Sequence, residues 1–309
     1  MFLTITFSPS VDLVIQTEVF EINSLNRYKN FNLFPGGKGI NASVVLSRMG
    51  FENTAITFFD KHTFNNLNSF WKKEQLNILN ITNAGVLPTR YNVKMFSKTS
   101  DFFELNGPRN QINEAQKNKL FKLLQKLTDK DFVYILGVVE ENLLVEILEI
   151  LNKQKVKFGL DIDTKNIMKF IDFKPYFYKP NLDELNINFK INSKKDIFDT
   201  LKYIQQKGAN NILLSLGDRG SILLDNKGIF YKSTLNIKVN IKSTVGAGDT
   251  LGSIFIANFL KTNNVEKSLI LATATATSTV SQWWLAKKKE AFSFKKFVKV
   301  EKFNDIKTN

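Results

Sequence analysis

Apolar and polar positions repeat with two different periods along the chain, and these periods predict strands that alternate with helices. Strands are predicted at 2–7, 54–59, 132–136, 156–160 and 211–215, with hairpin-like strands at 220–225 and 228–232, and helices at 38–49, 113–127, 141–153, 194–207, 247–261 and 265–281. Short apolar strands between amphipathic helices are typical of a parallel sheet that is covered on both faces. The expected fold class is therefore α/β, with a doubly wound, mostly parallel sheet.

Two regions interrupt this alternation. Residues 11–20 and 29–34, and again 90–97 and 101–106, resemble paired strands with no helix between them. We expect these segments, about 11–34 and 88–107, to form a small antiparallel sheet outside the main one, and the alternative is that they are edge strands of the main sheet. A separate sheet of this kind can cover a site as a lid. The expected organisation is a single domain, 1–309, with a lid.

Composition narrows the function classes. The chain has 309 residues and a formal net charge of +14, but its lysines are scattered, which is typical of solvated helix faces and does not indicate a nucleic-acid partner. The absence of cysteine excludes disulfides and thiolate metal sites. No apolar run reaches the roughly 20 residues of a membrane span, and the first residues do not resemble a signal peptide. We expect a cytoplasmic protein without a membrane partner, in which Trp71, Trp283 and Trp284 pack against other side chains.

The strongest local motif is STVGAGD at 243–249, which directly precedes an amphipathic helix. The first turn of a helix has unpaired N–H groups and a partial positive charge, and glycines let these groups approach an anion. Gly246, Ala247 and Gly248 therefore predict an anion hole. Asp249 would lie beside it as a carboxylate able to accept a proton from an attacking hydroxyl. The structural alternative is a tight turn with Asp249 as an N-cap.

Two further motifs combine polar groups with a helix start. PGGKGINA at 35–42 is not a P-loop, but it offers a flexible backbone, the cation of Lys38 and the amide of Asn41 to a polyol or phosphate. In KPNLDE at 179–184, Asn181 and Glu184 match a capping box. The functional alternative is that Glu184 and Asn181 help to hold Mg²⁺ through water.

Asp12 and several arginines are the remaining candidates. Asp12 follows the first predicted strand, where α/β enzymes bind ligands, and can accept hydrogen bonds from sugar hydroxyls. Arg27, Arg90 and Arg109 occur in a chain that otherwise prefers lysine, and a forked donor suits a phosphate group.

The motifs together resemble one known family over nearly the whole chain. They are TFSPSVD at 6–12, NR at 26–27, GGKGINA at 36–42, TRYNVK at 89–94, ELNGP at 104–108, YKPN at 178–181, SLG at 215–217 and STVGAGD at 243–249. In this order and spacing they resemble the PfkB, or ribokinase-like, carbohydrate kinases. The similarity is greatest to the branch of 1-phosphofructokinases and tagatose-6-phosphate kinases. The resemblance implies a doubly wound α/β fold with a β lid, which in this branch often contributes to a homodimer.

The resemblance also implies roles for individual residues. Asp249 would be the general base, and Gly246, Ala247 and Gly248 would form the anion hole. The other implied sites are the sugar phosphate site of Asp12, Arg27, Gly37, Lys38, Asn41, Arg90 and Asn92, the ATP site of Lys179, Asn181, Ser215, Gly217, Ser243 and Val245, and Glu184 for Mg²⁺, through water. The implied reaction is ATP-dependent phosphorylation of the 6-hydroxyl of D-fructose 1-phosphate.

One departure from the family pattern leaves alternatives open. GVVEE at 137–141 stands where the family commonly has a glycine- and serine-rich turn near the substrate. Tagatose 6-phosphate or another sugar therefore stays open as the substrate. A non-catalytic binding protein on the same fold is the remaining alternative.

Overall fold

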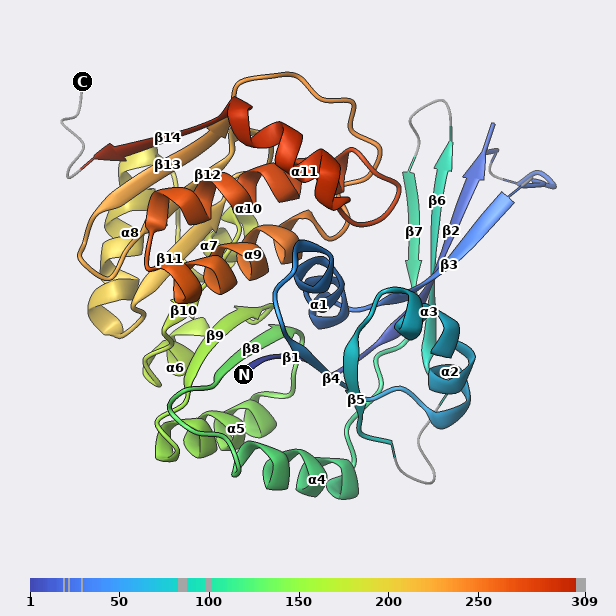
Figure 1. Cartoon of the computed structure of the whole chain (residues 1–309), viewed down its shortest axis with the longest axis horizontal. Helices are drawn as coiled ribbons and strands as arrows, with labels where there is room; N and C mark the ends of the chain where they lie inside the picture. The colour runs from blue at the N-terminus through green and yellow to red at the C-terminus, as the bar shows by residue number, and fades with distance from the viewer. Residues whose placement is uncertain (19, 22, 29, 83–87, 98–101, 304–309) are drawn as a thin grey trace.

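The computed structural model describes residues 1–303 apart from 19, 22, 29, 83–87 and 98–101. Its main sheet has the strand order β14-β13-β12-β11-β10-β9-β8-β1-β4-β5 (Figure 1). Seven strands run parallel, namely β1 Phe2–Thr6, β4 Thr54–Thr57, β5 Asn77–Asn80, β8 Phe132–Gly137, β9 Lys157–Ile162, β10 Phe177–Tyr178 and β11 Asn211–Ser215. Three antiparallel strands complete one edge, β12 Ser221–Leu224, β13 Phe230–Leu235 and β14 Val298–Phe303. The expected α/β class with a mostly parallel sheet is confirmed.

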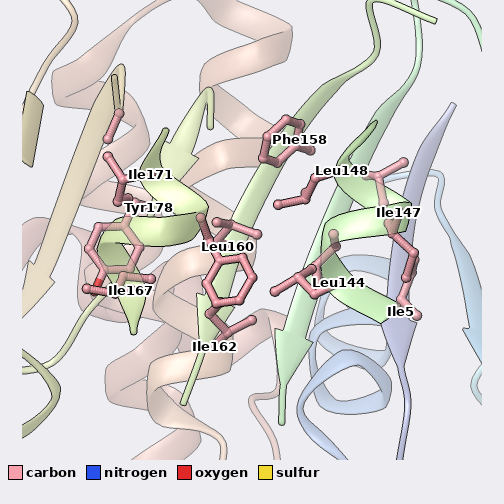
Figure 2. Close-up of a cluster of buried hydrophobic side chains, with 14 of the residues drawn as sticks. Ile5, Leu144, Ile147, Leu148, Phe158, Leu160, Ile162, Ile167, Ile171 and Tyr178 are labelled. Atoms are coloured by element: carbon pink, nitrogen blue, oxygen red, sulfur yellow. The ribbon is translucent and has the colours of Figure 1, made fainter. Parts of the chain in front are cut away.

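Helices cover both faces of this sheet, and β8 shows why. Successive side chains of a strand point to opposite faces, so Val133 and Ile135 enter one buried cluster while Tyr134 and Leu136 enter the other. The first face is covered by α4 Glu114–Leu124, α5 Glu141–Lys153, α6 Ile167–Ile171, α7 Leu182–Asn188 and α8 Lys194–Lys207. Figure 2 shows part of this cluster, where the side chains of β1, β9 and β10 meet α5 and α6. The second face is covered by α1 Lys38–Met49, α3 Asn68–Lys73, α9 Ala247–Thr262, α10 Val265–Val280 and α11 Lys288–Phe294.

The direction of winding reverses between β1 and β8. From β1 the chain proceeds to β4 and β5 on one side, and β8, β9, β10 and β11 follow in turn on the other side. In open α/β sheets ligands bind beyond the carboxyl ends of the strands at such a switch point. This edge of the sheet also receives the N-termini of α1 and α9, because Lys38 at the start of α1 pairs with Asp161 near the end of β9, and Gly248 in the first turn of α9 adjoins Lys179, which follows β10. The topology therefore assembles a site from distant parts of the sequence.

A second sheet stands beside the main body, at the right of Figure 1. Its strand order is β3-β2-β6-β7, and we call it the lid sheet; the strands are β2 Ser10–Thr17, β3 Asn30–Gly36, β6 Arg90–Ser97 and β7 Phe102–Asn106. The separate sheet was expected, but its expected antiparallel pairing is only partly right, because β2 and β6 run parallel. Asp12 lies inside β2, and not at the exit of the first strand as the sequence suggested. The two strands that pair in parallel are distant in sequence, so local patterns cannot predict their direction.

Several short elements were not predicted. The sequence analysis omitted β5, α3, α6, α11, β14 and α2 Lys61–Asn66, each of which spans seven residues or fewer. The helices among them are too short for a helical period to emerge clearly from a hydrophobic pattern. In the described part of the chain no helix is both long and apolar enough to cross a membrane.

Candidate active site

The N-terminus of α9 presents a bare backbone turn. Gly246 is its N-cap, with a left-handed φ of 78°. A Cβ there would lie 2.6 Å from Cδ2 of Leu285, so a larger residue would be strained and crowded. Ala247 donates its N–H to the carbonyl oxygen of Thr244 at 3.3 Å. Among the described residues, the N–H groups of Gly246, Gly248 and Asp249 make no hydrogen bond, so this turn can receive an anion.

Asp249 is buried in the first turn of α9 and is not its N-cap. Its Oδ2 accepts a hydrogen bond from Nδ2 of Asn41 on α1 at 2.8 Å. Burial raises the pKa of Asp249 to about 6, and the negative charge of Asp161 adds to this rise, while Lys38, Asn41 and Lys179 oppose it. The carboxylate is therefore mostly ionised at neutral pH and can still accept a proton readily.

Asp161 is the centre of the charge cluster beneath this turn. It is fully buried near the end of β9, with Oδ1 3.0 Å from Nζ of Lys38 and Oδ2 3.1 Å from Nζ of Lys179. The second contact is an ion pair without hydrogen-bond geometry, since Oδ2 has no hydrogen-bond partner among the described residues. Burial alone would raise the pKa of Asp161, but the two lysines outweigh it and lower this pKa. A Cβ on Gly248 would lie 3.5 Å from Nζ of Lys179, so this ammonium adjoins the anion-binding turn.

Sequence reasoning did not select Asp161. The predicted strand 156–160 ends one residue before it, and a carboxylate at the end of a buried strand is the same signal that selected Asp12. Asp161 was missed because no recognised motif includes it. Tyr134 was missed as well. Its hydroxyl is buried without a hydrogen-bond partner in the described part of the chain. Because Gly252 has no side chain, the hydroxyl of Tyr134 can approach the side chain of Lys179 there.

The predicted capping box at α7 is present. Asn181 Oδ1 accepts from the N–H of Glu184 at 2.8 Å, and Glu184 Oε2 accepts from the N–H of Asn181 at 2.9 Å. The other oxygen, Oε1, is 3.8 Å from Nζ of Lys38. Burial raises the pKa of Glu184, and Asp161 adds to this, while Lys179 and Lys38 oppose it. The capping role thus leaves one oxygen of Glu184 directed toward the charge cluster.

The donor set suits Mg²⁺ bound together with phosphate oxygens. Within the described residues no three acidic, histidine or cysteine side chains gather in a way that could hold a metal ion alone. Mg²⁺ commonly uses one or two carboxylates, substrate phosphates and water instead. Glu184 and Asp161 both approach Lys38, and Asp161 has an oxygen to which no described residue donates a hydrogen bond, so these carboxylates fit that requirement.

The predicted ATP residues lie along the same edge of the sheet. Asn181 and Ser215 form an isolated parallel bridge between neighbouring segments, and Gly217 follows with a positive φ of 63°. Ser243 is buried, and its Oγ accepts from the N–H of Val245 at 3.2 Å, which shapes the turn before α9.

The lid sheet contributes a second buried carboxylate, Asp12. Its Oδ1 accepts from Oγ of Ser10 and from Nδ2 of Asn92, each at 2.8 Å. Its Oδ2 lies 2.7 Å from Nζ of Lys94, which is also buried. A Cβ on Gly36 would be 2.4 Å from Oδ1 of Asp12, so only glycine fits there. Lys94 lies within the motif at 89–94, but the sequence analysis gave it no role.

The start of α1 and the predicted phosphate ligands, Arg90 and Arg27, lie in different surroundings. Gly37 has a φ of 117° and approaches the methyl group of Thr6. Arg90 is half-buried and donates to the carbonyl oxygens of Ser8 at 3.2 Å and Gly107 at 3.3 Å. Burial lowers its pKa, and the nearby charge of Arg109 lowers it further. Arg27 is exposed in the loop before β3 and makes no hydrogen bond or ion pair with any described residue.

Comparisons with known proteins identify the family of the chain. The family pattern of the pfkB family carbohydrate kinases matches residues 6–283. A 1-phosphofructokinase of Bacillus subtilis is 29% identical over 90% of this chain and 92% of its own length, and a D-tagatose-1-phosphate kinase of Bacillus licheniformis is 28% identical over 83% and 84%. The phosphofructokinase-2 of Escherichia coli, solved with substrates and products, shares the fold with a TM-score of 0.89 at 20% identity, covering 96% of this chain and 98% of that one. The chain therefore belongs to the pfkB family of carbohydrate kinases, which are sugar phosphotransferases.

Proposed function

We propose that this kinase transfers the γ-phosphoryl group of ATP to the 6-hydroxyl of D-fructose 1-phosphate, with fructose 1,6-bisphosphate and ADP as products. The observation that carries the proposal is the meeting of Asp249, the bare turn of α9 and the ammonium of Lys179 at the carboxyl edge of the parallel strands. The 1-phosphofructokinase from Bacillus subtilis, similar over most of the chain, supports this substrate.

The proposed chemistry assigns one task to each group. Asp249 takes the proton of the 6-hydroxyl as its oxygen attacks the γ-phosphorus, and the bond to the leaving oxygen of ADP breaks. The N–H groups of Gly246 and Gly248, with Lys179, meet the negative charge of the transferred group. Mg²⁺, when bound, would neutralise phosphate charge, and Glu184 through water and Asp161 are the residues we propose to hold it. Ser215, Gly217, Ser243 and Val245, with Asn181, line the ATP site in this proposal.

The lid sheet and the start of α1 would hold the sugar phosphate. Asp12 and Asn92 accept and donate hydrogen bonds to sugar hydroxyls, together with Gly37, Lys38 and Asn41. Arg90 and Arg109 bring two positive charges close together, which favours the phosphate already present on the substrate. Arg27, whose exposed guanidinium pairs with no described residue, remains a proposed ligand of the same phosphate. The whole chain then acts as a single kinase domain, in which residues 11–34 and 88–107 form the lid.

The direct test is a coupled assay of ADP release with a panel of sugar phosphates ranked by kcat/KM, which measures discrimination. D-Fructose 1-phosphate is expected to rank first. The second candidate is its C4 epimer D-tagatose 1-phosphate, because a similar protein bears that name. Tagatose 6-phosphate and fructose 6-phosphate complete the panel. Binding of ATP and sugar without ADP release from any of them would favour the non-catalytic alternative and overturn the proposal.

We also propose a homodimer through the lid sheet. Residues that are directly paired on neighbouring strands point to the same face of a sheet, so Asp12 and Asn92 lie on one face. The strands β3, β6 and β7 direct large apolar side chains to the other face. Several of these are exposed, namely Phe31, Leu33, Tyr91, Phe103 and Leu105. Leu33 and Tyr91 also border a groove of about 460 Å³ against α3. A second copy would bury this face. Tyr91→Glu is expected to shift the mass measured by light scattering toward the monomer, and a monomeric wild-type chain would contradict the dimer.

A further inference from the structure

A loop with two adjacent tryptophans links the lid sheet to the main body. This loop, residues 281–287, connects α10 to α11, and we call it the tryptophan loop. The ring of Trp284 stacks on Phe34 of β3, with centroids 4.5 Å apart and planes 6° apart. The ring of Trp283 meets Phe96 of β6 at 5.5 Å. The loop thus contacts both strands that flank β2, the strand of Asp12.

Both contacts fall on the polar face of the lid sheet. Phe34 pairs in register with Asp12, and Asn92 pairs with Asp12 from the other side, so all three share one face. Phe96 lies four residues beyond Asn92 on β6, and side chains two or four apart along a strand point the same way. The tryptophans therefore press on the face that carries the proposed sugar ligands, and not on the apolar back of the lid sheet.

The tryptophan loop is held firmly to the main body. The guanidinium of Arg48 lies 4.9 Å from the Trp284 ring, and its Nη1 donates to the carbonyl oxygens of Leu285 and Ala286 at 3.0 Å each. Glu74 accepts two bonds from Arg48, both of 2.8 Å, and so fixes the guanidinium. Phe70 of α3 meets Trp284 edge-on at 5.3 Å. Trp284 is therefore a rigid platform, and not a mobile surface residue.

The other end of the tryptophan loop abuts the anion-binding turn. Leu285 is buried against Gly246, where it occupies the space that a Cβ would need. The N–H of Ala286 donates to Oγ1 of Thr279 at 3.2 Å, Thr279 bonds Thr250 at 3.0 Å, and Thr250 donates to the carbonyl oxygen of Gly246 at 2.7 Å. One short segment thus contacts the lid sheet through its tryptophans and Gly246 through Leu285, while Ala286 is linked to Gly246 by a chain of hydrogen bonds.

We infer that Trp283 and Trp284 are positioning residues that hold the sugar-binding face of the lid sheet in register with the turn of α9. This inference rests on the proposed function, because it assumes that the lid face binds the acceptor sugar. A displacement of about 1 Å at the reacting groups can cost on the order of 100-fold in rate. The stack on Phe34 therefore controls where the acceptor hydroxyl lies relative to Asp249. In the proposed arrangement ATP contacts residues at the ends of β10 and β11 and does not depend on the stack.

The test compares Trp284→Ala with Trp284→Phe, using whichever sugar phosphate gives the wild type its highest kcat/KM. The choice of substrate by activity keeps the result independent of whether fructose 1-phosphate is correct. Trp284→Ala is expected to lower kcat/KM for the sugar phosphate roughly 10- to 100-fold, through both a higher KM and a lower kcat, with the KM for ATP changed by less than about twofold. Trp284→Phe keeps a ring for the stack and is expected to recover most of the loss.

Two variants separate positioning from general destabilisation. Phe303→Ala removes an aromatic stack with Phe230 at the far edge of the main sheet, centroids 5.8 Å apart, and is expected to leave both KM values unchanged. Trp283→Ala changes a side chain that is 38% exposed, so the fold should survive, and a smaller loss of the same kind is expected. The inference is wrong if Trp284→Ala leaves kcat/KM for the sugar within about twofold, or raises the KM of ATP as much as that of the sugar. If Trp284→Ala does not fold, Trp283→Ala decides by the same criterion.

Discussion

The lid sheet and the start of α9 each contribute one buried aspartate, and the two are bonded very differently. Asp12 in the lid sheet accepts hydrogen bonds from Ser10, Asn92 and Lys94, the last of which is a cation. Asp249 at the start of α9 accepts only one side-chain hydrogen bond among the described residues, from Asn41. Both are almost fully buried. The three donors around Asp12 suit a carboxylate that orients a ligand, whereas burial with a single side-chain donor raises the pKa of Asp249 to about 6 and suits a base.

This comparison predicts that substitution of Asp249 lowers mainly kcat, whereas substitution of Asp12 raises mainly the KM of the sugar phosphate. Asp249→Asn keeps the shape of the side chain but removes the base, so kcat should fall on the order of 100- to 10,000-fold while the sugar phosphate still binds. Stopped assays of product formation, with sugar affinity measured separately by calorimetry, give both values. A variant with near wild-type kcat would show that Asp249 is not the base.

Asp12→Asn should act mainly on binding. The amide side chain would keep one acceptor oxygen but would leave the buried ammonium of Lys94 without its carboxylate partner at 2.7 Å. A hydrogen bond from a sugar hydroxyl to a carboxylate contributes about 1.5–3 kcal/mol, and an amide accepts it less strongly, so the sugar KM should rise by up to roughly 150-fold, with kcat at saturation reduced much less. Steady-state assays at varied sugar phosphate and saturating ATP separate the two constants.

A matched control for Asp12→Asn is Lys94→Met, which breaks the same pair from the other side. Partners in one network are not additive, so Asp12→Asn combined with Lys94→Met should lose less than the product of the single losses. A dominant loss of kcat in Asp12→Asn would instead place Asp12 in the chemistry and remove the distinction between the two aspartates.

The sequence predicted the α9 half of the site better than the charges beneath it. Gly246, Gly248 and Asp249 are close neighbours in the chain, so a local motif contains the whole turn. The pairing of Asp161 with Lys38 joins residues 123 positions apart, and no local pattern can reveal it. The same reason explains Lys94, whose partner Asp12 is 82 positions away.

The fold shows the same division between local and distant information. Long helices such as α5 and α8 were predicted with their observed limits, because a period of 3.6 residues is clear over that length. The order of strands and the parallel pairing of β2 with β6 depend on contacts between distant segments, and so does the stack of Phe34 on Trp284. Sequence reasoning expected Trp284 to pack but had no means to predict its partner.

The pH dependence of activity tests the assignment of Asp249 as the base. The pKa of Asp249 is raised to about 6, and a general base must be deprotonated to work. The pH dependence of kcat/KM reports the pKa values of the free enzyme, so kcat/KM should fall about tenfold per pH unit below pH 6 and become constant above pH 6. Asn41→Ala removes the hydrogen bond that favours the ionised form and should move this limb to higher pH. If the fall of kcat/KM at low pH is unchanged in Asn41→Ala, the titrating group is not Asp249.

The smallest expected effect is on stability, and its sign follows from the same pKa. Because the pKa of Asp249 is raised from 3.8 to about 6, the folded state binds this proton more tightly than the unfolded state does. The stability contributed by this group is fully present below pH 3.8 and is lost as the pH rises through 6. At pH 7 the wild type therefore carries an unfavourable buried charge that Asp249→Asn lacks, and the Tm of this variant should be a few degrees higher.

That difference in Tm should shrink as the pH approaches 4, where the carboxyl of the folded wild type is protonated as well. Other titrating groups are common to the two proteins, so the difference between their Tm values isolates Asp249. Calorimetric scans of both proteins from about pH 4 to pH 8 provide the measurement. A gain that does not vary with pH would mean that the amide improves packing and that the charge of Asp249 costs nothing. Such a result would remove the cost of a buried charge from the explanation of how Asp249 acts as a base.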